Sequence, residues 1–203
     1  MGEIPQKMLA YPQMATFFLP GCMRLAGKVL VLLTFLLETK TMSTLQLTLD
    51  YLDRKEIRYV HTRHSPAHTA REVAKVEHMA PHKLAKTVVF HSEFGYGMAV
   101  VRADEFVDFE ELRVLLGARG VRLANEEELA ELFPGCELGA MPPFGNLFNM
   151  RVLMDRGLLA PTNIAFNAGT HRDLIHMSVD DFLQLAKPAV GDFAMRVEAL
   201  AAF

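Results

Sequence analysis

A lysine opens one of the most apolar stretches of the chain. Lys86 precedes residues 87–90, whose types are typical of a buried strand. An ammonium group at the mouth of such a strand is little diluted by water, so it could hold a phosphate or a polarised carbonyl. The same lysine could equally lie at an edge and extend its charged end into water. The residues alone leave both interpretations open.

A second feature is the segment PGCELGAMPPFGNLFN, residues 134–149, which interleaves glycine and proline with apolar side chains. Proline lacks a backbone donor and glycine weakens regular structure, so the segment predicts neither a helix nor an inner strand. It is also too apolar for an ordinary solvated loop. We interpret it as a stiff loop beside a pocket, because glycine permits close backbone approach and proline restricts rearrangement.

Nucleophiles and metal ligands are less clearly indicated. Cys136 lies in this loop and His171 lies in a later turn, so a Cys–His pair could act if the fold joined them. A lone cysteine is more often a small packed residue. His61, His64 and His68 could suggest a metal site, but no carboxylate or cysteine set accompanies them. We interpret them as loop and surface histidines, and we predict no metal and no cofactor.

Composition limits the class of protein. The 203 residues, 51% of them hydrophobic, suit one globular domain with some extension. A net charge of -3 gives no overall basic signature, so extensive nucleic-acid binding is not indicated, although a local basic patch over one RNA end remains compatible with it. The cysteines, Cys22 and Cys136, lack CxxC spacing, which predicts no disulfide framework and favours a cytoplasmic location.

The first 41 residues differ in character from the rest. Residues 29–37 are apolar or small but too few to span a bilayer, which needs about 20, and the ETKTMS that follows is a poor cleavage site. We interpret residues 1–41 as an N-terminal extension outside the native fold, with Met42 as the start of a domain covering residues 42–203. A signal or membrane-associated segment is the alternative.

From Met42 onward, helical and strand patterns are mixed. Capping boxes at Thr69/Glu72 and Asn125/Glu128 predict two helix starts, and the glycine-bearing turn SEFGYG predicts a hairpin. Hairpins together with scattered helices predict an α+β fold rather than a doubly wound sheet. The predicted helices cover residues 45–52, 69–78, 108–117, 125–133 and 179–186, and the predicted strands cover residues 58–61, 84–91, 97–103, 121–124, 151–155, 163–168 and 172–177.

Six segments in order resemble the YbaK/prolyl-tRNA-synthetase-associated editing domain family: SPAHTAREVA, LAKTVVF, VRLANEEEL, GCELGAMPPFG, RVLMD and NIAFNAGTH. The resemblance covers about residues 60–182, and the family consists of trans-acting aminoacyl-tRNA deacylases. It implies a single α+β domain with a mixed, mainly antiparallel sheet curled around a pocket and helices around the sheet. It also implies hydrolysis of the ester that joins a wrong amino acid to the tRNA 3′ end.

The resemblance implies site residues as well. The strand lysine of the family falls on Lys86, its Gly-x-x-x-Pro loop on Gly139 to Pro143, and its turn histidine on His171. In the family the lysine contacts the terminal adenosine region and the loop presents backbone groups to the aminoacyl moiety. Hydrolysis there depends on a positioned water or on the substrate's own groups, rather than on a protein nucleophile. We therefore expect Lys86, Gly139 and His171 to be catalytic. The expected substrate-binding residues are Thr69, Ala140, Met141, Pro142, Pro143, Phe144 and Gly169.

The implied partner is the 3′ end of a mischarged tRNA, with a misacylated prolyl tRNA as the first candidate, and an aminoacyl-tRNA synthetase is a further candidate. We expect no DNA partner and no membrane contact for the folded domain. Arg63, Lys75, Lys83 and Arg102 are candidate contacts to the RNA backbone. Two alternatives stay open: a non-catalytic tRNA or aminoacyl-ligand binding module of the same fold, and a cysteine hydrolase that uses Cys136. The amino acid removed is left undetermined.

Overall fold

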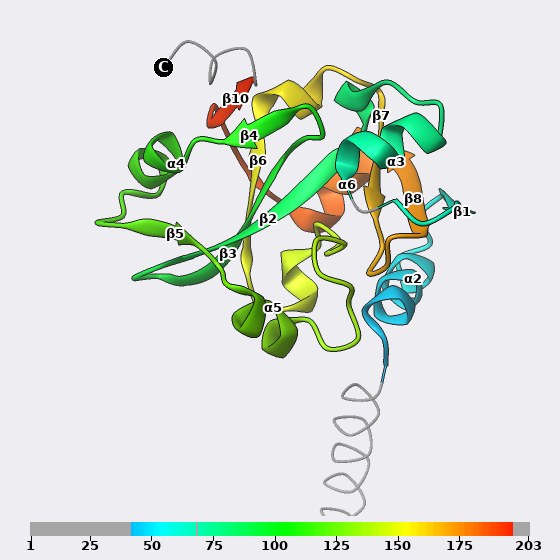
Figure 1. Cartoon of the computed structure of the whole chain (residues 1–203), viewed down its shortest axis with the longest axis horizontal. Coiled ribbons are helices and arrows are strands. Elements are labelled where there is room, and N and C mark those ends of the chain that lie inside the picture. Colours follow the sequence, from blue (N-terminus) through cyan, green and yellow to red (C-terminus); the bar gives the residue numbers. More distant parts are fainter. Residues whose placement is uncertain (1–41, 68, 197–203) are drawn as a thin grey trace, which may run out of the picture. The chain divides into compact units, whose positions relative to one another are not determined.

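The computed structural model describes residues 42–67 and 69–196 (Figure 1). The predicted N-terminal extension lies outside the described residues, so its interpretation stays a prediction. No helix within these ranges is long and apolar enough to cross a membrane.

The helices are α2 (Thr44–Arg54), α3 (Ala70–Val76), α4 (Phe109–Leu116), α5 (Glu126–Leu132) and α6 (Val179–Ala186), with 3₁₀ helices at Pro81–Lys83, Gly145–Leu147 and Arg156–Leu159. The strands are β1 (Tyr59–Arg63), β2 (Ala85–Ser92), β3 (Gly95–Arg102), β4 (Glu105–Val107), β5 (Val121–Leu123), β6 (Arg151–Asp155), β7 (Asn163–Asn167), β8 (Asp173–Ser178), β9 (Ala189–Gly191) and β10 (Ala194–Arg196).

Two of the helices begin at the capping boxes that the sequence predicts. The Thr69 hydroxyl accepts a hydrogen bond from the Glu72 N–H, and the Glu72 carboxylate accepts one from the Thr69 N–H. Asn125 and Glu128 make the same reciprocal pair before α5. Each box satisfies backbone donors that the first turn of a helix leaves unpaired. Both predicted helix starts are confirmed.

The strands form a mixed sheet system. One sheet has the order β5-β2-β3-β6-β9, a second has the order β1-β8-β7, and β10 pairs with β4. Strands β2 and β3 form the predicted hairpin, paired from Ala85↔Arg102 to Ser92↔Gly95. The β3–β6 and β6–β9 pairs are parallel, whereas β1–β8, β7–β8, β2–β5 and β10–β4 are antiparallel. The predicted α+β class with a mixed, mainly antiparallel sheet is confirmed.

A parallel bridge between Leu84 and Ala165 brings the start of β2 beside β7. Because successive side chains point to opposite faces, β2 contributes to two clusters. Val89 packs in the main core, whereas Phe90 packs in a second cluster that includes Leu112 of α4. Burial on both faces explains why this strand has a continuous apolar run rather than an alternating pattern.

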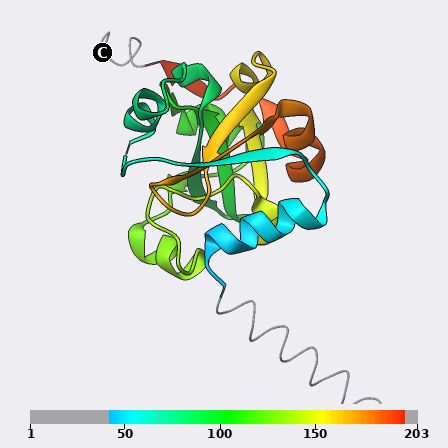
Figure 2. The ribbon, with the colours of Figure 1, turned by 90° about the vertical axis from the view of Figure 1, so that its right-hand side faces the viewer.

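Helix α2 packs close to the proline-rich loop and to the turn between β7 and β8. Figure 2 shows β1 crossing in front of the other strands, with α2 beneath it. Near the start of α2, the Thr44 hydroxyl donates to the Pro134 carbonyl over 3.3 Å. Gly169 has a φ of +99°, and a Cβ there would lie 2.8 Å from the backbone nitrogen of Leu45. A larger residue at 169 would therefore push the β7–β8 turn away from the helix.

Candidate functional site

Backbone hydrogen bonds join the proline-rich loop to the turn between β7 and β8. The Glu137 N–H donates to the Gly169 carbonyl over 2.9 Å, and the Gly169 N–H donates to the Ala140 carbonyl over 2.8 Å. Within the loop, the Ala140 N–H donates to the Glu137 carbonyl over 3.0 Å. The loop and the turn are therefore positioned together, although about 30 residues separate them in the sequence.

Gly139 and His171 meet at this junction. Gly139 is exposed and has a φ of +89°, in the left-handed region that favours glycine. A Cβ at this position would lie 3.6 Å from Cε1 of His171, which is itself buried. The His171 N–H donates to the Glu137 carboxylate. Two of the three predicted catalytic residues are thus adjacent.

The predicted substrate-binding residues of the loop differ in exposure. Gly139 is exposed, whereas residues 140–144 are buried. The Phe144 ring packs edge-on against Tyr51 and Phe166, with ring centroids 5.5 and 5.4 Å away, and lies 5.8 Å from the Phe182 ring. Phe144 therefore anchors the loop to the hydrophobic core. Direct contact between substrate and the five buried residues, Ala140, Met141, Pro142, Pro143 and Phe144, stays a prediction.

Lys86, the third predicted catalytic residue, lies near the start of β2, where this strand runs beside β7 of the second sheet. Its Nζ is 4.6 Å from the centre of the Phe106 ring on β4, which is a cation–π contact. The Leu84–Ala165 bridge lies two residues before Lys86 on β2, and β7 runs from this bridge toward Gly169. The bridge therefore places Lys86 on the strand next to the one that leads into the turn.

The segment before α3 also contacts the turn. The Ala67 N–H donates to the His171 carbonyl over 3.2 Å, and the His64 N–H donates to the Arg172 carbonyl over 2.9 Å. Thr69, a predicted substrate-binding residue, lies two residues beyond Ala67 and is exposed, with its hydroxyl engaged in the α3 cap. The fold thus gathers near one turn the segments that carry Thr69, Gly139, Gly169 and His171.

A buried carboxylate stabilises the turn. Asp173 is 4% exposed; its Oδ2 accepts a hydrogen bond from the Thr170 hydroxyl, and its Oδ1 lies 2.8 Å from Nε2 of His61. Burial acts to raise the pKa of Asp173, but the hydrogen bonds from Thr170 and His61, with the charges of His61 and Arg63, outweigh it, so the pKa is lowered. The sequence gives no sign of this role for Asp173, because its partner His61 lies 112 positions away in the chain.

We expect Asp173→Asn to destabilise the domain at neutral pH by about 1–3 kcal/mol, because it weakens two hydrogen bonds to a buried carboxylate. A carboxyl with a lowered pKa stabilises the fold above its unfolded pKa of about 3.9, and this stabilisation is lost as pH falls through the lower folded value. Urea unfolding at pH 7 and pH 3 measures the difference. Asp180→Asn, at an exposed position, is the control. If Asp173→Asn lowered the free energy of unfolding by the same amount at both pH values, the expectation would be contradicted.

Cys136 is a poor candidate for the nucleophile. Burial raises the pKa of its thiol to about 12, a hydrogen bond with Thr44 lowers it in part, and the charge of Glu137 raises it slightly. Its Sγ donates to the Glu137 carbonyl over 3.4 Å. Because a thiolate rather than a thiol attacks esters, this environment disfavours the cysteine-hydrolase alternative.

We therefore expect Cys136→Ser to hydrolyse mischarged tRNA at close to the wild-type rate. The measurement is release of a labelled amino acid, with thermal unfolding recorded in parallel to confirm that the variant is folded. A loss of more than about tenfold in a folded variant would restore Cys136 as a nucleophile candidate.

The histidines have other partners. Among residues 42–67 and 69–196, no group of three or more His, Cys, Asp or Glu side chains could hold a metal ion. His61 pairs with Asp173, and Nδ1 of His64 lies 2.7 Å from the Ser65 carbonyl oxygen. His68, the third member of the motif, lies outside the described residues.

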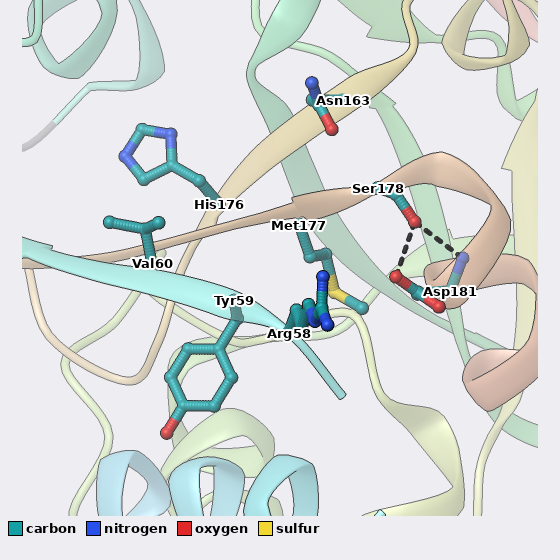
Figure 3. A pocket seen from close by; sticks show the side chains of 8 residues that line it. All are labelled: Arg58, Tyr59, Val60, Asn163, His176, Met177, Ser178 and Asp181. Carbon is teal, nitrogen blue, oxygen red and sulfur yellow. Dashed lines mark hydrogen bonds between the residues drawn. The ribbon is translucent and has the colours of Figure 1, made fainter. Parts of the chain in front are cut away.

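A hollow of about 530 Å³ lies elsewhere on the second sheet (Figure 3). It adjoins the start of β7 and the end of β8, whereas the turn with His171 connects the other ends of these strands. Burial lowers the pKa of His176 in its wall, partly countered by Glu77. Its lining residues are Arg58, Tyr59, Val60, Asn163, His176, Met177, Ser178 and Asp181. His176, the lining residue nearest to the turn in sequence, follows His171 by five residues, so at most about 17 Å of extended chain separate this hollow from the predicted site.

The chain is similar to known aminoacyl-tRNA editing proteins. Residues 64–185 match the family model described as the aminoacyl-tRNA editing domain. The chain is 32% identical over 97 residues to the multifunctional Ser/Thr-tRNA deacylase ProXp-y of Escherichia coli (strain K12), covering 47% of this chain and 58% of that protein. It is 30% identical over 112 residues to proline–tRNA ligase of Thermosipho africanus (strain TCF52B), covering 55% of this chain and 19% of the ligase.

A solved structure shares the fold. A protein proposed to be a trans-editing enzyme for prolyl tRNA synthetase superimposes with a TM-score of 0.66 at 24% identity, covering 76% of this chain and 98% of that one. The aligned part spans less than two thirds of the deacylase and about a fifth of the ligase.

Proposed function

The chain belongs to the aminoacyl-tRNA editing domain family, and from this premise we propose that it hydrolyses the ester between a tRNA 3′ end and a wrong amino acid. The observation that carries the proposal is the proximity of Gly139 to the His171 ring, in a loop and a turn held together by backbone hydrogen bonds. Attack on an ester creates an oxyanion, which backbone N–H groups stabilise best when they are already in position. An exposed glycine lets the ester approach the backbone closely.

The nucleophile in this proposal is a water molecule. Gly139 faces the His171 ring, so the imidazole could orient the water or accept its proton at the ester. The raised pKa of Cys136 supports this assignment over a covalent intermediate on sulfur. Lys86, on the strand next to β7, is proposed to contact the phosphate or ribose of the terminal nucleotide.

The RNA contacts are proposed on the elements beside the turn. Arg63, Lys75 and Lys83 are exposed on β1, α3 and the 3₁₀ helix at Pro81–Lys83. Their charges could neutralise phosphates near the acceptor end. Arg102 is a poorer candidate than predicted, because its side chain is 13% exposed and its Nη2 lies 2.9 Å from the Glu105 carboxylate.

The substrate class is proposed from the relatives. One relative is named as a Ser/Thr-tRNA deacylase and another as a proline–tRNA ligase, so we propose a tRNA that carries a small wrong amino acid, with misacylated prolyl tRNA as the first candidate. A small pocket distinguishes one methylene by only about 1–3 kcal/mol, which is why a separate hydrolytic site adds fidelity.

The test is a panel of tRNAs charged with wrong amino acids, including prolyl tRNA carrying Ala, Cys, Ser or Thr. The full chain is incubated with each member, and loss of the labelled ester is compared with spontaneous loss. Faster loss for at least one member supports the deacylase. Binding of charged tRNA without accelerated ester loss across the panel would instead support the alternative, a non-catalytic binding module.

A further inference from the structure

We propose that the Glu137 carboxylate binds the α-ammonium group of the aminoacyl moiety. This inference rests on the proposed function, since it places the aminoacyl ester at Gly139. An α-amino group is common to all aminoacyl esters and is lost when the amine is acylated. Glu137 would therefore make the site require a free amino group, whatever the amino-acid side chain.

Glu137 is held in place from three directions. Its N–H donates to the Gly169 carbonyl, its carbonyl accepts from the Ala140 N–H, and its Oε2 accepts from the His171 N–H. Because both backbone and side chain are engaged, the carboxylate has little rotational freedom left to lose on binding. It is a preorganised group two residues from Gly139.

The other carboxylate oxygen, Oε1, has no hydrogen bond or ion pair within residues 42–67 and 69–196. The residue is exposed, so a ligand can reach it. The structural hydrogen bond to the His171 N–H requires an acceptor oxygen, which a neutral glutamine would also provide. The negative charge of Glu137 is therefore not needed to hold the turn.

Charge complementarity identifies the occupant. When the amino-acid side chain is uncharged, the aminoacyl group carries one cation, the α-ammonium. This group is on the carbon bonded to the ester carbonyl. With that carbonyl near the Gly139 backbone, the ammonium lies within a few ångströms, in reach of a carboxylate two residues away. A charged hydrogen bond between the two would orient the ester as well as strengthen binding.

Glu137→Gln separates the charge from the structural role, because its amide oxygen can still accept the His171 N–H. Wild type and variant are assayed with prolyl tRNA that carries alanine and with the same substrate after N-acetylation of the alanine. We expect wild type to prefer the free amine by about tenfold in kcat/KM, the scale of one charge-assisted contact. The variant should lose this preference and hydrolyse the N-acetylated substrate at the wild-type rate. Glu131→Gln, which removes an exposed charge from α5, should retain the preference.

A binding measurement separates this inference from the proposed function. The non-hydrolysable 3′-(alanylamino)-3′-deoxyadenosine and its N-acetyl derivative are titrated calorimetrically into wild type, Glu137→Gln and Glu131→Gln. Weaker binding of the acetylated probe to wild type, with the difference absent in Glu137→Gln, supports the role of Glu137 even if no tRNA is hydrolysed. Equal binding of both probes to wild type, or an unchanged preference in Glu137→Gln, overturns it even if hydrolysis is efficient.

Discussion

Lys86→Ala is expected to lower kcat/KM for ester hydrolysis by about 100-fold, the usual effect of removing one positioned electrostatic group from a site. The lysine stem lies on a strand between two packed clusters, and its ammonium is oriented over the Phe106 ring. Its charge therefore acts from a defined position instead of sampling solvent. Alanine removes both this charge and its contact with the ring. Steady-state hydrolysis of the best substrate in the panel measures the loss.

Two further variants define what the lysine contributes. Lys86→Arg retains the cation and its attraction to an aromatic ring, so it should recover part of the activity. Lys83→Ala removes an exposed charge three residues away and should weaken substrate binding only slightly, mainly at low salt. Wild-type activity in a folded Lys86→Ala variant would show that this residue is an edge lysine without a catalytic role.

Gly139→Ala is expected to reduce turnover by about 100-fold, because a misplacement on the order of 1 Å near reacting atoms has effects of this size. The left-handed backbone at φ +89° favours glycine, and the new Cβ would lie 3.6 Å from the His171 ring. In the proposed mechanism, the added methyl would occupy the face that the ester approaches. The strain should lower the free energy of unfolding by only about 1–2 kcal/mol, so the variant should fold.

Gly95→Ala is a matched control for that experiment. Gly95, the first residue of β3 after the hairpin turn, has a φ of +94°, and nothing lies within 4 Å of the Cβ that alanine would add. Its backbone strain should therefore be similar while the site is untouched. Thermal unfolding should show comparable shifts for the two variants, whereas only Gly139→Ala should lose hydrolysis. Parallel loss of activity in both would mean that the effect reflects stability.

Much of the local structure follows from the sequence. The helix starts at Thr69 and Asn125 were predictable, because a capping box uses residues three apart in the chain. The end of α4 at Gly117, with φ +63°, follows from the tolerance of glycine for the left-handed region. The β2–β3 hairpin was predictable for the same kind of reason, since a short turn determines which strands pair.

Other elements were not predicted. The strands β4, β9 and β10 are three residues each, which gives a period of two little room to show in the sequence, although the equally short β5 was predicted. The parallel pairing of β6 with β3 and β9 also leaves no local signature, because these partners come from distant parts of the chain. Such pairings depend on the packing of the whole domain.

The candidate site divides in the same way. From the sequence alone, the proline-rich loop was recognisable as stiff and apolar, and the resemblance to a family assigned Lys86, Gly139 and His171 to one site. The tertiary structure decided which loop residues face solvent: Gly139 is exposed and Phe144 is in the core. It also brought Glu137 to the His171 N–H, a contact across 34 positions. The physical reason is that composition determines how much apolar surface a loop must bury, whereas the partners that bury it are determined only when distant segments pack together.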